Sequence, residues 1–73
     1  MNHKVKEIIG YTTFLVLAFA KKHGLSELEA FRYIRNFKGL GYIYDCYDAI
    51  HTFDFNESVE SVRLICKQNG GNI

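Results

Sequence analysis

The chain contains no proline and only two cysteines among its 73 residues. Helix interiors tolerate proline poorly, so its absence favours an all-helical protein. Cys46 and Cys66 belong to no CxxC pair, and two thiols alone cannot hold a zinc ion. We therefore expect no metal site and no cofactor, and we interpret both cysteines as small, buried, reduced side chains.

The sequence also lacks a secretion signal and a membrane-length apolar run. Lys4 and Lys6 precede apolar residues, but no small-residue cleavage site follows them. The run from Ile8 to Ala20 spans about 13 residues, whereas a membrane-spanning helix needs about 20. We therefore predict a cytoplasmic protein that does not enter the membrane.

A strong excess of charge of either sign is missing too. The formal net charge is +1, whereas a nucleic-acid-binding domain usually carries a basic excess, so we consider a nucleic-acid partner unlikely. The charge is unevenly spread: residues 1–39 hold seven basic and three acidic residues, and residues 40–73 hold two basic and five acidic residues. Either the two halves neutralise each other within the fold, or a bipolar surface meets a partner or a second copy head to tail.

Apolar and aromatic residues are abundant instead. They make up 48% and 15% of the chain, which is typical of a globular protein. The length suits one domain. We predict an all-α protein, a small bundle of four short helices in a single domain over residues 1–73. We expect an ordered core over about residues 3–67 and a frayed C-terminal tail over 68–73.

The first predicted helix covers about residues 2–22. Apolar residues recur at three- and four-residue spacing, and from Phe14 to Ala20 the helix is apolar all round. Such a helix must be covered on more than one side, by the other helices or by a second copy of the chain. Lys21, Lys22 and His23 suit its C-terminal end, and we expect His23 to be exposed.

The second predicted helix begins at a capping box. Ser26 can accept from the amide of Glu29, whose side chain can reach back to the amide of Ser26. We expect Gly39 to end this helix. Its predicted buried stripe consists of Ala30, Phe31, Ile34 and Phe37. Its candidate basic face consists of Arg32, Arg35 and Lys38, which could meet phosphates or an acidic partner, or could simply face water.

The third predicted helix runs from about Leu40 to His51 or Thr52, and Asp54 or Asn56 can cap the fourth. The predicted apolar face of the third helix contains Leu40, Ile43, Tyr44, Tyr47, Ile50 and His51. The predicted stripe of the fourth contains Phe55, Val59, Val62, Ile65 and Cys66.

One cluster of polar residues contains side chains of the kinds that catalyse reactions. Its candidate residues are Tyr44, Tyr47, Asp48 and His51, with Asp54 as a further candidate, and Thr52 follows them as a candidate motif residue. Asp48 and His51 stand three residues apart on a helix, so the carboxylate could orient the imidazole and raise its pKa, as a general base requires. No nucleophile or glycine-rich loop accompanies them. The structural alternative is that His51 closes the third helix by bonding Asp48 or a loop carbonyl.

The segment Tyr47-Asp48-Ala49-Ile50-His51-Thr52 resembles a Tyr-Asp-x-Leu-His-Thr signature, preceded here by the Leu25-Ser26-Glu27 helix start. A family of small uncharacterised bacterial helical proteins carries this signature, and the similarity extends from the first helix to about Lys67. Ile50 departs from the usual leucine. Genes of that family often lie beside predicted ADP-ribosyltransferase-like toxin genes, so the resemblance implies an accessory or neutralising role in a toxin–antitoxin-like pair.

Three functions follow as hypotheses. The first is a non-catalytic module that binds a partner protein or associates with itself as a homo-oligomer, because apolar and aromatic residues exceed what four short helices can bury. The second is a helix-turn-helix-like DNA-binding protein, although its recognition helix would carry Asp45 and Asp48, whose negative charges repel phosphates. The third is an enzyme that uses His51.

Overall fold

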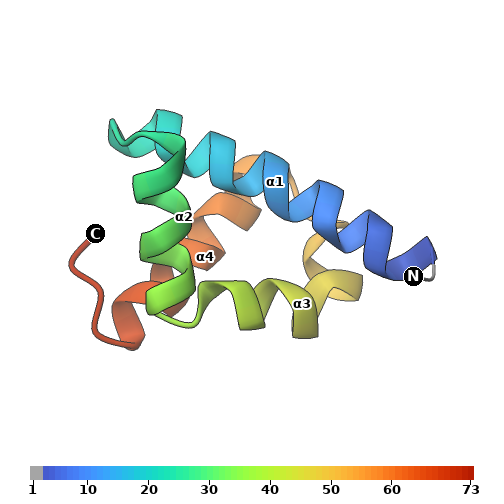
Figure 1. Ribbon diagram of the computed structural model, residues 1–73. Helices are drawn as coiled ribbons and strands as arrows, with labels where there is room; N and C mark the ends of the chain where they lie inside the picture. Colours follow the sequence, from blue (N-terminus) through green and yellow to red (C-terminus); the bar gives the residue numbers. More distant parts are fainter. Residues whose placement is uncertain (1–2) are drawn as a thin grey trace.

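The computed structural model describes residues 3–73 and contains four α-helices joined by short turns (Figure 1). They are α1 (His3–His23), α2 (Glu27–Asn36), α3 (Gly39–Ile50) and α4 (Phe55–Gln68). The predicted start of the first helix at Asn2 lies outside the described residues. The all-α class and the four-helix architecture are confirmed.

The longest helix, α1, packs across the other three, and every pair of helices is in contact. The chain turns sharply after α1 into the short helix α2, and α3 then runs back beneath α1, with α4 alongside (Figure 1). Within residues 3–73, none of these helices combines the length and the apolar character that a membrane span requires.

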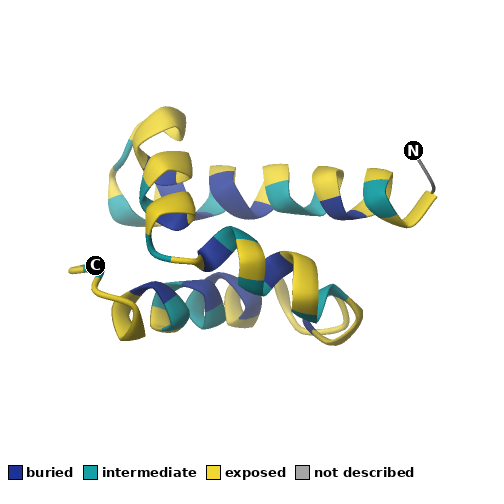
Figure 2. Ribbon diagram, turned by 60° about the horizontal axis from the view of Figure 1, so that its bottom comes forward, coloured by how far each residue is buried: buried dark blue, intermediate teal, exposed yellow. Residues whose placement is uncertain are grey.

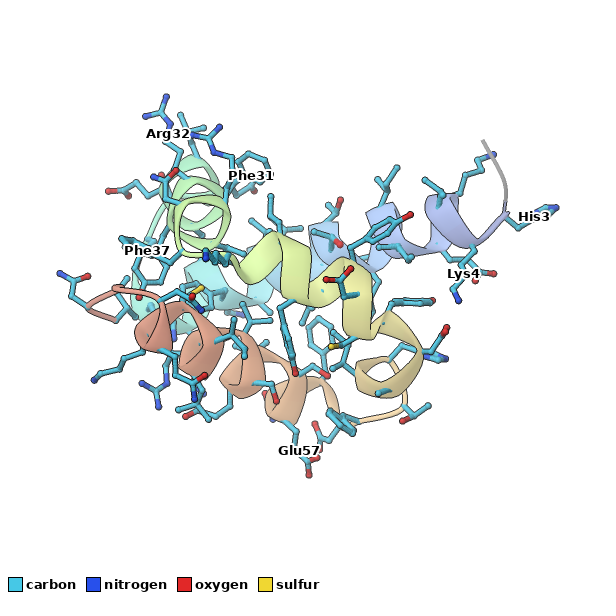
Figure 3. All side chains as sticks on the ribbon, turned by 90° about the horizontal axis from the view of Figure 1, so that it is seen from below. His3, Lys4, Phe31, Arg32, Phe37 and Glu57 are labelled. Atoms are coloured by element: carbon cyan, nitrogen blue, oxygen red, sulfur yellow. The ribbon has the colours of Figure 1, made fainter. Side chains whose placement is uncertain are left out.

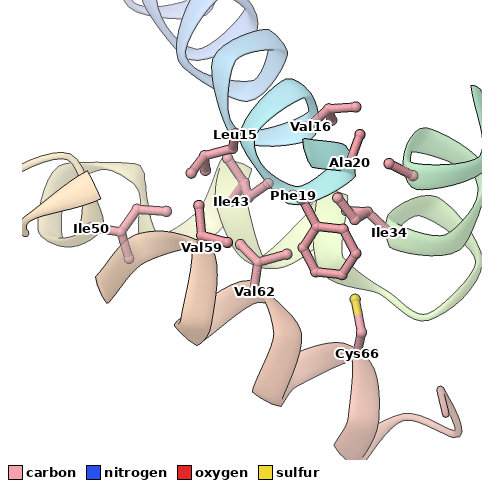
Figure 4. Packing of buried hydrophobic residues seen from close by; sticks show 11 residues of the cluster. Leu15, Val16, Phe19, Ala20, Ile34, Ile43, Ile50, Val59, Val62 and Cys66 are labelled. Atoms are coloured by element: carbon pink, nitrogen blue, oxygen red, sulfur yellow. The ribbon is translucent and has the colours of Figure 1, made fainter. Parts of the chain in front are cut away.

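The core forms where the four helices converge. Phe19 of α1 is fully buried at its centre, facing Ile34, Val62 and Cys66 from three different helices (Figure 4). Each such apolar side chain stabilises the fold by about 1.5–3 kcal/mol relative to leaving it exposed. The core residues are Leu15, Val16, Phe19, Ala20, Ala30, Ile34, Ile43, Ile50, Val59, Val62 and Cys66.

Local capping interactions begin α2 and α4. The Ser26 hydroxyl accepts a hydrogen bond from the Glu29 amide (3.1 Å), and the Glu29 carboxylate accepts one from the Ser26 amide (2.8 Å), so the predicted capping box is confirmed. These bonds hold the pKa of Glu29 below its ordinary value. Of the two candidate caps of α4, Asp54 is the residue used, and it accepts from the Asn56 amide at 2.9 Å.

The junction between α2 and α3 differs from the prediction. Helix α2 ends at Asn36, and the left-handed residue that follows is Lys38, with φ 69°, rather than Gly39. Gly39 is the buried first residue of α3, and a Cβ there would lie 2.6 Å from Ile34 Cγ2 and 3.0 Å from Cys66 Sγ. The glycine therefore allows three helices to approach closely, and the neighbouring lysine adopts the strained turn.

The prediction of a frayed tail over residues 68–73 was wrong. Helix α4 includes Gln68, and the chain then folds back against the bundle. The Gly71 amide donates to the Cys66 carbonyl (2.9 Å), and the Ile73 amide donates to the Tyr33 hydroxyl (3.0 Å). Arg63 donates to the Ile73 carbonyl at 3.2 Å. Together these bonds offset the entropy that glycine-rich tails usually retain, and the bond to Tyr33, 40 positions away, is not revealed by local sequence spacing.

Candidate functional site

An apolar groove of about 690 Å³ lies between α1, α2 and α3. Residues of α1 from Ile8 to Leu17 form one side of it, and residues of α2 and α3 form the rest. Its lining consists of Ile8, Ile9, Thr12, Thr13, Val16, Leu17, Glu27, Leu28, Phe31, Leu40 and Tyr44. Glu27 is the one charged residue among them.

The rims of the groove expose large apolar side chains from all three helices. Ile9 of α1 is 52% exposed, Leu28 of α2 is 55% exposed, and Tyr44 of α3 is 57% exposed. The Thr13 hydroxyl donates to the Ile9 carbonyl at 2.9 Å, so this polar group is already satisfied within α1. A contiguous exposed apolar surface of this kind marks interaction sites in soluble proteins.

Phe31 forms part of the α2 wall, and its predicted burial was wrong because it is 38% exposed. The core side of α2 is filled by Ala30 and Ile34, which leaves Phe31 turned towards the groove. The guanidinium carbon of Arg35 lies 5.8 Å from the centre of its ring, within cation–π range. Tyr44 and Phe55 were also predicted in buried stripes and are likewise exposed.

The candidate basic face of Arg32, Arg35 and Lys38 is exposed along its whole length. Arg32 extends away from the body of the molecule, on the same part of α2 as Phe31 (Figure 3). Arg35 stacks on Phe31 instead of projecting freely, and Lys38 occupies the turn into α3. The three cations therefore differ in setting, and the structure does not gather them around a recess.

Tyr44 also borders a smaller pocket of about 300 Å³ between the start of α1 and α3. Its polar members are Lys4, Tyr44, Asp45, Tyr47 and Asp48. Lys4 Nζ lies 2.7 Å from Asp48 Oδ2, and this hydrogen bond raises the pKa of the Lys4 ammonium. Both side chains are more than half exposed, so the pair contributes little to stability.

His51 closes α3 and does not pair with Asp48. Its Nδ1 lies 2.7 Å from the Tyr47 carbonyl oxygen, and because a carbonyl can only accept, Nδ1 carries the proton and donates. The imidazole stacks on the Tyr47 ring with centroids 4.6 Å apart. The Thr52 hydroxyl donates to the Ala49 carbonyl at 2.7 Å. The two local bonds satisfy carbonyls in the last turn of α3.

The polar cluster predicted from sequence is thus divided among three roles. Tyr44 belongs to the groove, Asp48 binds α1 through Lys4, and Tyr47, His51 and Thr52 finish α3. Within the part of the chain that the structure describes, no group of three or more His, Cys, Asp or Glu side chains is placed to hold a metal ion.

The sequence prediction missed Ile9 and Leu28 as site residues. Leu28 carried a signal, since it is a large apolar residue outside the predicted buried stripe of its helix. Ile9 gave no such indication, since it is one of the regularly spaced apolar residues of the first predicted helix. Figure 2 shows exposed residues recurring on the edge of α1 that faces away from the other helices, which agrees with a helix only partly covered by its own chain.

Comparison with known proteins gives one family. No curated protein matches the chain, and no solved structure matches it. A family model described as a protein of unknown function, DUF3791, matches residues 10–69 and so includes most of α1 and the other three helices. The chain therefore belongs to the DUF3791 family.

Proposed function

We propose that this chain is a non-catalytic protein-binding module, whose docking surface is the apolar groove between α1, α2 and α3. The observation that carries the proposal is the concentration of half-exposed apolar side chains from three helices around one recess. The predicted surplus of apolar residues is consistent with this surface. Burying such rims against a partner provides the hydrophobic core that stable interfaces need.

The shape and charge of the groove favour an amphipathic helix as its occupant. Its sides are formed by helices, and an apolar helix stripe is a common ligand for such grooves. Glu27 lines the groove, and Asp45 lines the smaller pocket that shares Tyr44 with it. A partner helix with an apolar stripe flanked by basic residues would complement both carboxylates.

The resemblance noted in the sequence implies the partner to test first, the product of the gene beside this one. Neutralising a toxin-like enzyme requires only a docked surface, which is why we extend the proposal to an accessory role in such a pair. Cys46 and Cys66 are free thiols, which supports placing the protein in the reducing cytoplasm.

The test is a binding measurement with that neighbouring gene product. Leu28→Glu puts a charge on the groove rim without touching the core, and we expect at least about tenfold weaker binding. Leu64→Glu is the matched control, since Leu64 is 46% exposed on α4 outside the groove. Equal binding by the wild type and Leu28→Glu, or equal losses in both variants, would refute the groove as the docking surface.

The two alternative functions receive less support. A helix-turn-helix protein would read DNA with α3, but that helix presents the exposed carboxylates of Asp45 and Asp48 and would be repelled by phosphates. An enzyme based on His51 would need a base oriented by Asp48, whereas that carboxylate bonds Lys4. We therefore favour the binding module.

A further inference from the structure

A second unpartnered surface runs the length of α1, on an exposed flank that meets the groove at Leu17. Six residues, His3, Glu7, Gly10, Phe14, Leu17 and Lys21, follow one another at alternating spacings of four and three. All six are exposed. This spacing places the six residues on one face of the helix, with Phe14 and Leu17 as its large apolar side chains, and we call them the α1 seam.

The centre of the α1 seam contains a projecting ring next to an empty space. Phe14 is 65% exposed, the largest exposed fraction among the large apolar side chains of the described residues. One turn earlier, Gly10 has no heavy atom within 4 Å of the position that a Cβ would occupy. A phenylalanine and an open glycine thus stand side by side on the same exposed stripe.

The ends of the α1 seam carry opposite charges. Glu7 lies towards its start and Lys21 at its end, and neither forms an ion pair within residues 3–73. Two parallel copies of α1 would bring like charges together at each end. Two antiparallel copies would instead bring Glu7 of each chain within about one helical turn of Lys21 of the other.

We infer that the chain forms a two-fold symmetric homodimer in which α1 packs antiparallel to α1 of a second copy. A two-fold axis midway between Gly10 and Phe14 places the ring of each chain in the open space over the other chain's glycine. The same axis sets Glu7 of each chain opposite Leu17 of the other chain, about one helical turn from its Lys21. The α1 seam is therefore complementary to itself, as an isologous interface requires.

This interface is separate from the groove, with which it shares only Leu17. One helix pair with two apolar side chains per copy makes a small interface, so we expect a weak dimer that dissociates on dilution. A dimer formed in this way leaves Leu28, Phe31 and Tyr44 of each chain free for the partner of the proposed function. The two surfaces thus share one residue per chain, and Phe14→Glu in the α1 seam and Leu28→Glu on the groove rim test them separately.

The experiment is sedimentation equilibrium of the full chain from low micromolar to millimolar concentration. We expect the apparent mass of the wild type to rise from one chain towards two. Phe14→Glu should weaken association at least about tenfold, because it replaces the central apolar ring with a charge. Gly10→Gln tests the same point without a charge, since its side chain fills the space and suits a helix.

Charge reversal tests the antiparallel orientation. Glu7→Lys and Lys21→Glu should each weaken the dimer, and the double variant should restore it, because each new lysine again meets a glutamate of the other copy. Leu64→Glu, outside the α1 seam, should associate like the wild type, and circular dichroism confirms that each variant is folded. A wild type that stays monomeric throughout, or unchanged association by Phe14→Glu and Gly10→Gln, overturns the dimer, and a double variant weaker than both singles overturns its orientation.

Discussion

The hydroxyl oxygen of Tyr33 lies 3.0 Å from the backbone nitrogen of Ile73, which joins α2 to the end of the chain across 40 positions of sequence. The same tyrosine ring packs on Phe19 and Phe37, with ring centroids 5.8 and 4.9 Å away. A Cβ at Gly71 would overlap its hydroxyl oxygen, so the tail can lie here only because that position is glycine. A ring on α2 thus orders a segment that resembles a disordered tail in the sequence.

Removing that hydroxyl should loosen the tail and leave the bundle intact. We expect Tyr33→Phe to lower the free energy of unfolding by about 1 kcal/mol, because one hydrogen bond is lost while the aromatic packing stays. Amide hydrogen exchange at Ile73 should accelerate more than exchange in the core. Tyr44→Phe is the control, since that ring is exposed on α3. Unchanged exchange at Ile73 in Tyr33→Phe would contradict the assignment.

Two glycines of α3 should respond in opposite directions to alanine. Gly39→Ala adds a methyl group 2.6 Å from Ile34 Cγ2 and should cost about 1–3 kcal/mol of stability. Gly41→Ala adds one in open space within the helix and should add about 0.5–1 kcal/mol. Chemical denaturation of both variants measures the contrast. Similar effects in the two would show that close packing is not the reason for Gly39.

Lys38 adopts the left-handed conformation that a lysine favours less than a glycine. Lys38→Gly should therefore stabilise the protein by about 1 kcal/mol, because relief of backbone strain exceeds the extra entropy of glycine in the unfolded chain. Lys38→Val, which is β-branched, should destabilise it. Thermal unfolding of the pair is the measurement, and a glycine variant less stable than the wild type would refute the strain.

His23 should make stability depend on pH in the weakly acidic range. Contrary to the predicted exposure, it is half-buried against Phe19, and its Nε2 is buried without a hydrogen-bond partner within the described residues. Burial is the largest cause that lowers the pKa of its imidazole below the ordinary 6.5, and the positive charges of Lys22 and Arg63 lower this pKa further. The carboxylate of Glu60 acts in the opposite direction.

The lowered pKa of His23 determines how stability changes with pH. Because the folded state binds the proton less readily than the unfolded chain, stability is complete above pH 6.5 and falls as the pH drops through 6.5 towards the lowered pKa. His23→Leu should flatten this part of the profile, and the same substitution at the exposed His3 should leave it unchanged. Denaturation midpoints of the wild type and both variants, measured between pH 8 and pH 5, test this prediction. A wild type equally stable at both ends would contradict the prediction.

A second loss of stability should follow at lower pH. Hydrogen bonds from Ser26 and Arg63 respectively lower the pKa values of Glu29 and Glu60 below 4.5, so their contribution is present above that value and is lost as the pH falls below it. Glu29→Gln should reduce this acid-induced loss and leave the His23 range unaffected. Acid titration followed by circular dichroism separates the two ranges.

Local signals in the sequence predicted most of the fold. The capping box at Ser26 was identified correctly, and Asp54 was one of the two candidate caps of α4, because each cap depends on residues within three positions of one another. The end of α2 was predicted wrongly at Gly39. Glycine has two uses, as a left-handed turn residue and as a place of close approach, and sequence alone does not say which applies.

The candidate site was less predictable than the helices. Tyr44 was recognised as a site residue but placed on a buried stripe, and the groove that it borders depends on how α1, α2 and α3 cross. Helical periodicity shows which residues share a face, but it does not show how much of that face the neighbouring helices cover. Asp48 bonds Lys4 instead of His51 for the same reason, since its partner comes from 44 positions away.

The amino-acid order alone specified four helices, their caps and the apolar material that joins them, because these depend on interactions between near neighbours. Only the packing of the helices decided which apolar residues stay uncovered, which carboxylate meets which cation, and where the last residues lie. Those outcomes depend on distances between segments remote in the chain. The groove and the α1 seam, on which both functional proposals depend, belong to this second class.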